Sequence, residues 1–143
     1  IGDGPDKQWL VDVIKEMHLE EQVRILGAIP NSELMPYYER ANVFVMPSNE
    51  EGFPHVLLEA MASGVPIVAF AVGGVLDIVP PEVRPFIVHS SRSDLLCEKI
   101  KELSVLSAEK RIELIDREKA WVQQFDIDNV VEQFIKLCTN IKE

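Results

Sequence analysis

The sequence predicts an α/β domain in which a Rossmann-like parallel sheet is flanked by helices. Apolar segments of strand length at 42–48, 65–72 and 84–89 lack polar alternation, as expected for strands covered on both faces. Segments with apolar residues at helical spacing separate them, and this alternation is typical of parallel sheets. With 143 residues the chain has the size of one domain, which we expect to span 1–143.

The composition excludes several classes of function. The chain is 47% apolar and 27% charged, and its longest apolar stretch, at 65–72, is too short to span a membrane. Its net charge of −10 argues against nucleic acid as a partner. We see no signal peptide and expect a cytoplasmic protein, with Cys97 and Cys138 as buried, reduced thiols at apolar helix positions.

The first half of the chain is predicted to hold two helices and two strands. It opens on Ile1-Gly2-Asp3-Gly4-Pro5, which resembles the end of a buried strand running into a turn, so we expect an N-terminally truncated sequence. Leu10 and Val13 are helically spaced, Trp9 is expected at a core position, and Pro36 is tolerable only near a first helical turn. The expected elements are a helix over 6–18, a strand over 23–29, a helix from Asn31 or Ser32 to about Ala41, and a strand over 42–48.

The second half begins with a helix bounded by typical start and stop residues. Pro54 stands at its first position and Gly64 just beyond its end. Pro80 and Pro81 end a short helix, and Asn129 with Glu132 is expected to cap the terminal helix. The expected elements are helices over 54–63, 75–79, 93–105, 108–125 and 129–140, and strands over 65–72 and 84–89.

Two loops are predicted to lie at the same edge of the sheet. SNEEGFP follows the strand at 42–48, and AVGG follows the strand at 65–72. Ligands of parallel α/β sheets bind at the carboxyl ends of the strands, where both loops begin. We therefore expect the binding site at this edge.

The helix that starts at Pro54 carries an acid in an unusual place. Its first backbone amides and dipole favour a phosphate group. Glu59 lies inside the apolar run VLLEAMA, where its carboxylate suits the vicinal hydroxyls of a ribose, while Glu51 in the preceding loop suits a further sugar. A purely structural explanation stays open: Glu50 and Glu51 complement the helix dipole, and Glu59 pairs with His55.

These residues carry a resemblance to a known family. The stretch EEGFPHVLLEAMASGVPIVAF at 50–70 resembles the signature of the retaining glycosyltransferases of family 4, with its Glu-x7-Glu pair at Glu51 and Glu59. The resemblance implies a GT-B architecture, in which two Rossmann-like domains face each other across a cleft. This chain is similar to most of the C-terminal, donor-binding domain. Further matching segments are GDGP at 2–5, VRILGAIPNSEL at 23–34, YYERANVFVMPS at 37–48 and GGVLDIV at 73–79.

The resemblance also assigns roles to individual residues. Glu51 contacts hydroxyls of the donor hexose and is the implied catalytic residue, and Glu59 binds the ribose of the nucleotide sugar. The amides of Val56 and Leu57 receive the diphosphate, and Ile29 lies against the base. The other implied donor-binding residues are Gly4, Gly52, Phe53, Pro54 and His55, while Gly73 and Gly74 mainly keep the site open.

The chain lacks two parts of the family pattern. The Arg/Lys pair that neutralises the diphosphate lies upstream of GDGP in the family, and the N-terminal acceptor domain is also absent. Asp77 stands where Glu is commoner. We therefore expect the 143-residue chain alone to be catalytically inactive and to bind nucleotide weakly at best.

The function implied by the resemblance is transfer of a sugar, with retention, from a nucleotide-diphosphate sugar to a glycan, lipid or other acceptor. The EGFP form of the motif favours a UDP-sugar over a GDP-sugar. A non-catalytic nucleotide-sugar-binding module and a disaccharide synthase or phosphorylase of the same fold are the alternatives. Expected partners are the nucleotide sugar, the missing N-terminal domain and the acceptor, and peripheral contact with the inner membrane face through that domain stays open.

No metal or other cofactor is expected. Asp126-Ile127-Asp128 is formally a D-x-D pattern, which holds a metal in another glycosyltransferase fold. Its position between two predicted helices favours helix capping instead.

Overall fold

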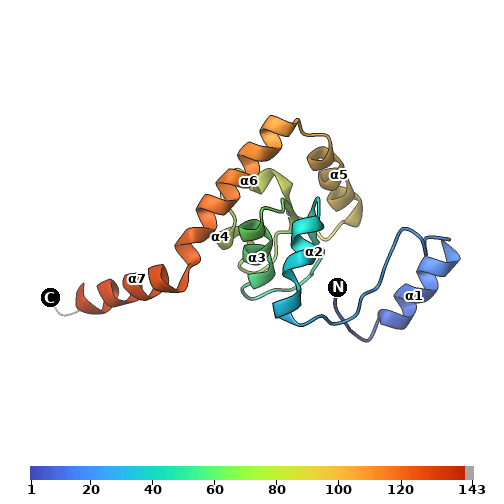
Figure 1. The fold of residues 1–143 in the computed structure, drawn as a ribbon, viewed down its shortest axis with the longest axis horizontal. Helices are drawn as coiled ribbons and strands as arrows, with labels where there is room; N and C mark the ends of the chain where they lie inside the picture. Colours follow the sequence, from blue (N-terminus) through green and yellow to red (C-terminus); the bar gives the residue numbers. More distant parts are fainter. Residues whose placement is uncertain (141–143) are drawn as a thin grey trace. The chain divides into compact units, whose positions relative to one another are not determined.

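The computed structural model describes residues 1–140, without the side chains of Phe134 and residues 137–140 (Figure 1). The chain divides into two compact units, Ile1–Pro36 and Tyr37–Glu143.

The first unit contains α1 (Lys7–Glu16) and the 3-10 helix η1 (Asn31–Glu33). The helix expected to reach His18 ends earlier, because His18 takes a left-handed backbone conformation with φ 55°. Trp9, expected in the core, is 64% exposed, so that expectation was wrong. Ile14 is the buried side chain of α1.

The strand predicted over 23–29 does not form. The segment forms no helix or strand, although the Gly2 N–H donates a 2.7 Å hydrogen bond to the Gly27 carbonyl. A strand requires a ladder of such bonds to a neighbour, and apolar, β-branched residues alone do not provide one.

The helix expected from Asn31 or Ser32 to Ala41 is split in two. Asn31–Glu33 form η1, and α2 (Met35–Arg40) follows. The ring of Pro36 would clash with the carbonyl of Ser32 in one continuous helix, so the chain restarts with Pro36 in the first turn of α2.

The second unit is built on a parallel sheet, as predicted, and this sheet has three strands in the order β1-β2-β3. Its strands are β1 (Phe44–Met46), β2 (Ile67–Phe70) and β3 (Ile87–Val88), with Val45 opposite Val68 and Ala69 opposite Ile87. The predicted last strand is shorter than expected, because its first half forms the 3-10 helix η2 (Arg84–Phe86) around Pro85. Proline has no N–H for the ladder.

Helices flank this sheet. Both α3 and α5 pack on β2, and α6 packs on α3 (Figure 1). Along the chain, α4 lies between β2 and η2, and the short helix η3 connects α6 to α7. The bounds are α3 (His55–Ser63), α4 (Val75–Ile78), α5 (Ser93–Ser104), α6 (Ala108–Val122), η3 (Gln123–Phe125) and α7 (Ile127–Asn140).

The helix ends follow local capping rules. Gly64 closes α3 in the left-handed conformation with φ 79°, as its position predicted. The Ser107 hydroxyl accepts from the Lys110 N–H at the start of α6. The terminal helix begins at Ile127 rather than at Asn129, because Asp126 Oδ1 already accepts the Asp128 N–H at 3.0 Å.

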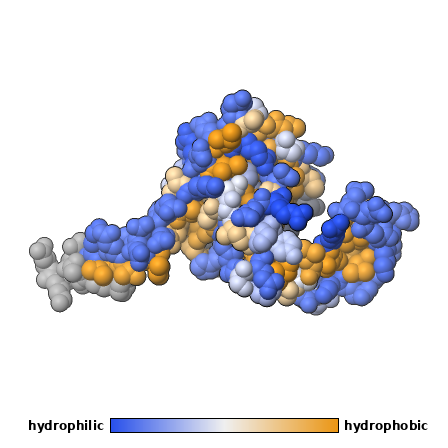
Figure 2. All heavy atoms as spheres, viewed as in Figure 1, coloured by the Kyte–Doolittle hydropathy of each residue, from blue (hydrophilic) through white to orange (hydrophobic). Residues whose placement is uncertain are grey.

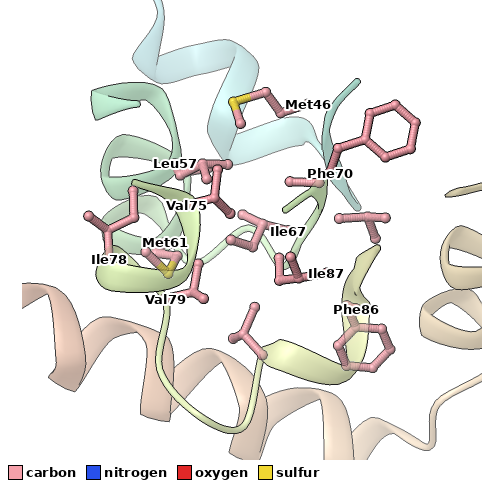
Figure 3. Packing of buried hydrophobic residues seen from close by; sticks show 14 of the residues in the cluster. Met46, Leu57, Met61, Ile67, Phe70, Val75, Ile78, Val79, Phe86 and Ile87 are labelled. Atoms are coloured by element: carbon pink, nitrogen blue, oxygen red, sulfur yellow. The ribbon is translucent and has the colours of Figure 1, made fainter. Parts of the chain in front are cut away.

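The hydrophobic core lies between β2 and its covering helices (Figure 3). All four residues of β2 are buried, which explains why this strand reads as a continuous apolar run. Side chains from α3, α4 and the segment before β3 fill the space around it. Labelled members are Met46, Leu57, Met61, Ile67, Phe70, Val75, Ile78, Val79, Phe86 and Ile87.

One acid lies inside this core. Glu118 of α6 is fully buried between Leu114 and Val122 of the same helix stripe, and neither carboxyl oxygen has a hydrogen-bond partner in the described structure. Burial raises the pKa of Glu118 to about 8. The Ile67 amide and the Arg111 guanidinium oppose the rise without hydrogen-bonding these oxygens.

At the surface of the fold, one cysteine is exposed, and the terminal helix α7 exposes apolar side chains. Cys97, expected to be buried, is exposed on α5. The side chain of Cys138 lies outside the described residues. Along α7, Figure 2 shows apolar side chains gathered on one side. Among the exposed apolar residues of this helix are Ile127, Val130 and Ile135.

Candidate functional site

The site is built from two loops at the carboxyl ends of β1 and β2. The loop 47–53 follows β1, and residues 71–74 follow β2. The Gly74 N–H donates a 3.0 Å hydrogen bond to the Gly52 carbonyl, so the two loops are in direct contact. This confirms the prediction that both loops lie at one edge of the sheet.

Glycine is required where these loops touch. A Cβ on Gly73 would lie 1.6 Å from the Glu51 carbonyl oxygen, and one on Gly74 would lie 2.8 Å from the Gly52 carbonyl oxygen. Gly73 also has φ 49°, which other residues adopt rarely. The role expected for these glycines was to keep the site open. The structure shows that they also allow the backbone of the Glu51 loop to pack directly against its neighbour.

The first turn of α3 offers fewer free amides than predicted. The His55 N–H donates to the Phe53 carbonyl and the Leu57 N–H to the Pro54 carbonyl, each at 3.0 Å. Of the first amides, which were expected to receive a phosphate group, these two are therefore bonded within the turn, which has no side-chain cap. The Val56 N–H has no hydrogen-bond partner in the part of the chain that the structure describes.

Side chains in this turn divide between core and surface. Leu57 is fully buried and Pro54 is buried, so they anchor the start of α3. His55 and Val56 are exposed. Because the Leu57 side chain is buried in the core, only its backbone amide could contact the diphosphate, as the prediction for Leu57 states.

Phe53 connects the site loop to the C-terminal helices. It is 46% exposed, and its ring lies edge-on to His55 and Phe125, with centroid distances of 5.2 and 6.2 Å. Phe125 belongs to η3, far away in the sequence. Such edge-to-face pairs each add about 0.5–1.5 kcal/mol beyond simple burial.

Glu59 lies on α3, and both its backbone carbonyl and its carboxylate accept hydrogen bonds from other side chains. The Ser63 hydroxyl donates to the Glu59 carbonyl at 2.8 Å, and the Tyr38 hydroxyl donates to Glu59 Oε2 at 3.0 Å. Burial raises the pKa of the Tyr38 phenol, and the hydrogen bond and negative charge of Glu59 raise it further. Tyr38 was not singled out from the sequence, because a hydrogen bond between α2 and α3 leaves no local pattern.

The other predicted residues are distributed over both units. Glu51 is half-buried in the loop after β1. Gly4 and Ile29 belong to the unit Ile1–Pro36, where Ile29 is half-buried and the Gly4 carbonyl accepts the Lys7 N–H at the start of α1. The structure thus joins the loops of Glu51, Gly52 and Phe53 with Gly73 and Gly74 in the second unit.

The residues that the structure describes contain no metal-ligand cluster and no membrane-spanning helix. Among them, no three His, Cys, Asp or Glu side chains form a group that could hold a metal ion. Of the D-x-D pattern, Asp126 caps the terminal helix by accepting the Asp128 N–H, whereas Asp128 lies in the first turn of that helix. None of the helices in 1–140 is long and apolar enough to cross a bilayer.

Comparison with known proteins places the chain in a family. Residues 1–121 match the family described as glycosyl transferases group 1. A glycosyltransferase of Haemophilus influenzae is 27% identical over 94% of this chain and 37% of its own length. The chain therefore spans about a third of the length of that relative.

Solved structures share the fold. A sucrose-phosphate synthase of Thermosynechococcus elongatus superposes with a TM-score of 0.79 and 28% identity, over 96% of this chain and 35% of that one. The Anabaena protein HepE, in complex with UDP and glucose, superposes with a TM-score of 0.69 and 21% identity, over 97% of this chain and 39% of that one. These neighbours are GT-B glycosyltransferases, and the family match covers most of the sequence. The chain belongs to the glycosyl transferases of group 1.

Proposed function

We propose that the chain is the donor-binding part of a retaining, family-4 type GT-B enzyme that transfers a hexose from a nucleotide-diphosphate sugar. One observation carries this proposal. The loop of Glu51, the glycine pair Gly73-Gly74 and the start of α3 meet at the carboxyl edge of the sheet, with Glu59 along the same helix. In α/β sheets, this edge is where nucleotides bind.

The proposed roles follow the order of a nucleotide sugar along the site. Glu59 accepts hydrogen bonds from the ribose hydroxyls, and the Val56 amide faces the diphosphate at the positive end of the α3 dipole. Glu51 orients the donor hexose, with Gly52 and Phe53 beside it. Amides fixed at a helix N-terminus stabilise the charge that develops on a departing diphosphate, which lowers the barrier to transfer.

A UDP-sugar is the donor that we favour, with a GDP-sugar as the alternative. The EGFP form of the motif supports this choice by resemblance. A protein of the same fold was solved with UDP and glucose, so the fold accommodates this kind of ligand. We further propose that the acceptor is bound by a separate domain of the protein.

Binding of nucleotide sugars by the full-length protein tests the proposal. We expect calorimetric titration to detect one of UDP-, GDP- and ADP-glucose, and Glu59→Ala to weaken its binding at least about tenfold, since charged hydrogen bonds contribute about 1.5–3 kcal/mol each. Glu39→Ala, an exposed acid on α2, is the matched control and should bind as the wild type does. Absence of binding, or an unaffected Glu59→Ala variant, would refute the proposal. The anomeric configuration of the product, read by NMR, tests retention.

A second candidate is a synthase that acts on a soluble sugar acceptor. The similarity to a sucrose-phosphate synthase, at 28% identity over nearly the whole chain, favours it over a purely binding module. Incubation of the full-length protein with donor and either fructose 6-phosphate or a lipid-linked acceptor distinguishes this candidate from a glycolipid or polysaccharide transferase.

A further inference from the structure

The contact between Tyr38 and Glu59 links two helices at the candidate site. Tyr38 is on α2 and Glu59 is on α3, and both belong to the second unit. The Tyr38 hydroxyl donates to Glu59 Oε2 over 3.0 Å, which is a normal length for a hydrogen bond to a carboxylate.

The position of the phenol is fixed by its own surroundings. Tyr38 is half-buried, and its ring lies against that of Phe44 in β1 with a centroid distance of 5.9 Å. Its carbonyl accepts the Ala41 N–H at the end of α2. The tyrosine is therefore held by the sheet and by its helix, whereas the neighbouring Tyr37 is 43% exposed.

The phenol acts only as a donor to the carboxylate. Burial and the negative charge of Glu59 raise the pKa of Tyr38, so the hydroxyl keeps its proton at neutral pH. An ionised carboxylate accepts about four hydrogen bonds, so a bond from Tyr38 can coexist with bonds from a ligand. Fixing a glutamate rotamer before binding removes an entropy cost that a free side chain would incur on binding.

We propose that Tyr38 is a positioning residue that holds the Glu59 carboxylate in the orientation that meets the ribose hydroxyls of the donor. This inference rests on the proposed function of Glu59. It adds a residue from α2 to a site whose other residues come from the loops and α3.

The test is calorimetric titration of the full-length protein with UDP, GDP and their 2′-deoxy analogues. Tyr38→Phe keeps the ring against Phe44 and removes only the hydroxyl. We expect it to weaken binding of the preferred ribonucleotide about three- to tenfold, which matches the cost of immobilising one flexible side chain. Tyr37→Phe, the matched control on the exposed neighbour, should bind as the wild type does.

Two further measurements separate positioning from a general structural role. The loss in Tyr38→Phe should be smaller for the deoxynucleotide, which lacks one of the hydroxyls that Glu59 would bind. It should also vanish in a Glu59→Ala background, because nothing is then left to position. Thermal unfolding of each variant records any change in stability separately.

The outcomes distinguish this inference from the proposed function. If Glu59→Ala weakens binding and Tyr38→Phe does not, Tyr38 has no positioning role, although Glu59 keeps its own. An equal loss for both nucleotides, or one that persists without Glu59, would show that Tyr38 acts through packing alone. If the wild type binds neither UDP nor GDP, or Glu59→Ala binds as the wild type does, the assignment of Glu59 fails and this inference fails with it.

Discussion

At the scale of single residues, Glu118 is a side chain whose apolar surroundings do not suit a charged group. It is fully buried, without a hydrogen-bond partner in the described structure, and its pKa is raised to about 8. The spacing of Leu114, Glu118 and Val122 places an acid within an apolar helix stripe, and this pattern is a sequence signal that could have identified it.

The raised pKa makes stability depend on pH. The unfolded state ionises this acid near its ordinary pKa of about 4.3, whereas the folded state keeps it protonated up to about pH 8. Between these values the folded state binds more protons, so the contribution of Glu118 to stability falls by about 1.4 kcal/mol per pH unit as the pH rises.

We expect Glu118→Gln to remove this dependence. The test measures the free energy of unfolding of both proteins in urea at several pH values. The value for the variant minus that for the wild type should increase from pH 5 to pH 8, and this difference should be constant above pH 8. Glu113→Gln, at an exposed position five residues earlier on α6, is the control. Parallel curves for the wild type and Glu118→Gln would show that the buried acid is not protonated.

Gly73 allows a second prediction at the residue scale. A methyl group there would overlap the Glu51 carbonyl oxygen, and its positive φ disfavours any other residue. We expect Gly73→Ala to reduce the free energy of unfolding by about 1–3 kcal/mol. The control is Gly52→Ala, whose Cβ would meet no atom within 4 Å and whose φ is not left-handed. Equal stability of the two variants would contradict the close approach of the loops.

At the scale of elements, α6 and α7 differ in how much they contribute to the hydrophobic core and so to stability. Three side chains of α6 are buried, including Leu114. The described side chains of α7 are exposed, apolar ones included. Cooperative stability of this chain should therefore depend on α6 and little on α7.

Alanine substitutions of similar size test this difference. We expect Leu114→Ala to cost about 2–5 kcal/mol, because it leaves a cavity against the core. Ile135→Ala, at a side chain that is 56% exposed, should change the free energy of unfolding by less than about 0.5 kcal/mol. Denaturant unfolding of the 143-residue chain measures both, and a large loss in Ile135→Ala would mean that α7 packs on the core in solution.

The elements also show how far local sequence signals reach. Gly64 predicted the end of α3, and Pro54, expected as its first residue, is the residue just before its start at His55. The buried strand β2 followed from its unbroken apolar run, because these signals lie in or next to the element itself. The expected strand at 23–29 failed, since strand formation depends on a partner that its own residues do not specify.

The candidate site was also predicted only in part. The meeting of the Glu51 loop with Gly73 and Gly74 follows from parallel topology, which the sequence revealed. The bond from Tyr38 to Glu59 depends on how α2 and α3 pack, and the local bonding of the His55 amide depends on backbone detail. Neither is encoded in a short pattern.

At the scale of the whole molecule, the chain covers about a third of its relatives, so activity is expected to need more than these residues. Under the proposed function, another part of the protein binds the acceptor and provides the cationic side chains that neutralise the diphosphate. We expect the 143-residue chain to show no sugar transfer in a turnover assay in which the full-length protein is active. Transfer by the chain alone would contradict this division of roles.

The contact between the two site loops also limits how this protein can change during evolution. Backbone that is hydrogen-bonded and packed at van der Waals distance leaves no room for an added residue, so insertions between Glu51 and Phe53 should be rejected. The exposed turn at 89–92, after β3, has no such constraint among the described contacts and should vary in length. Related sequences and insertion libraries should therefore keep the first loop at constant length, whatever sugar each enzyme uses.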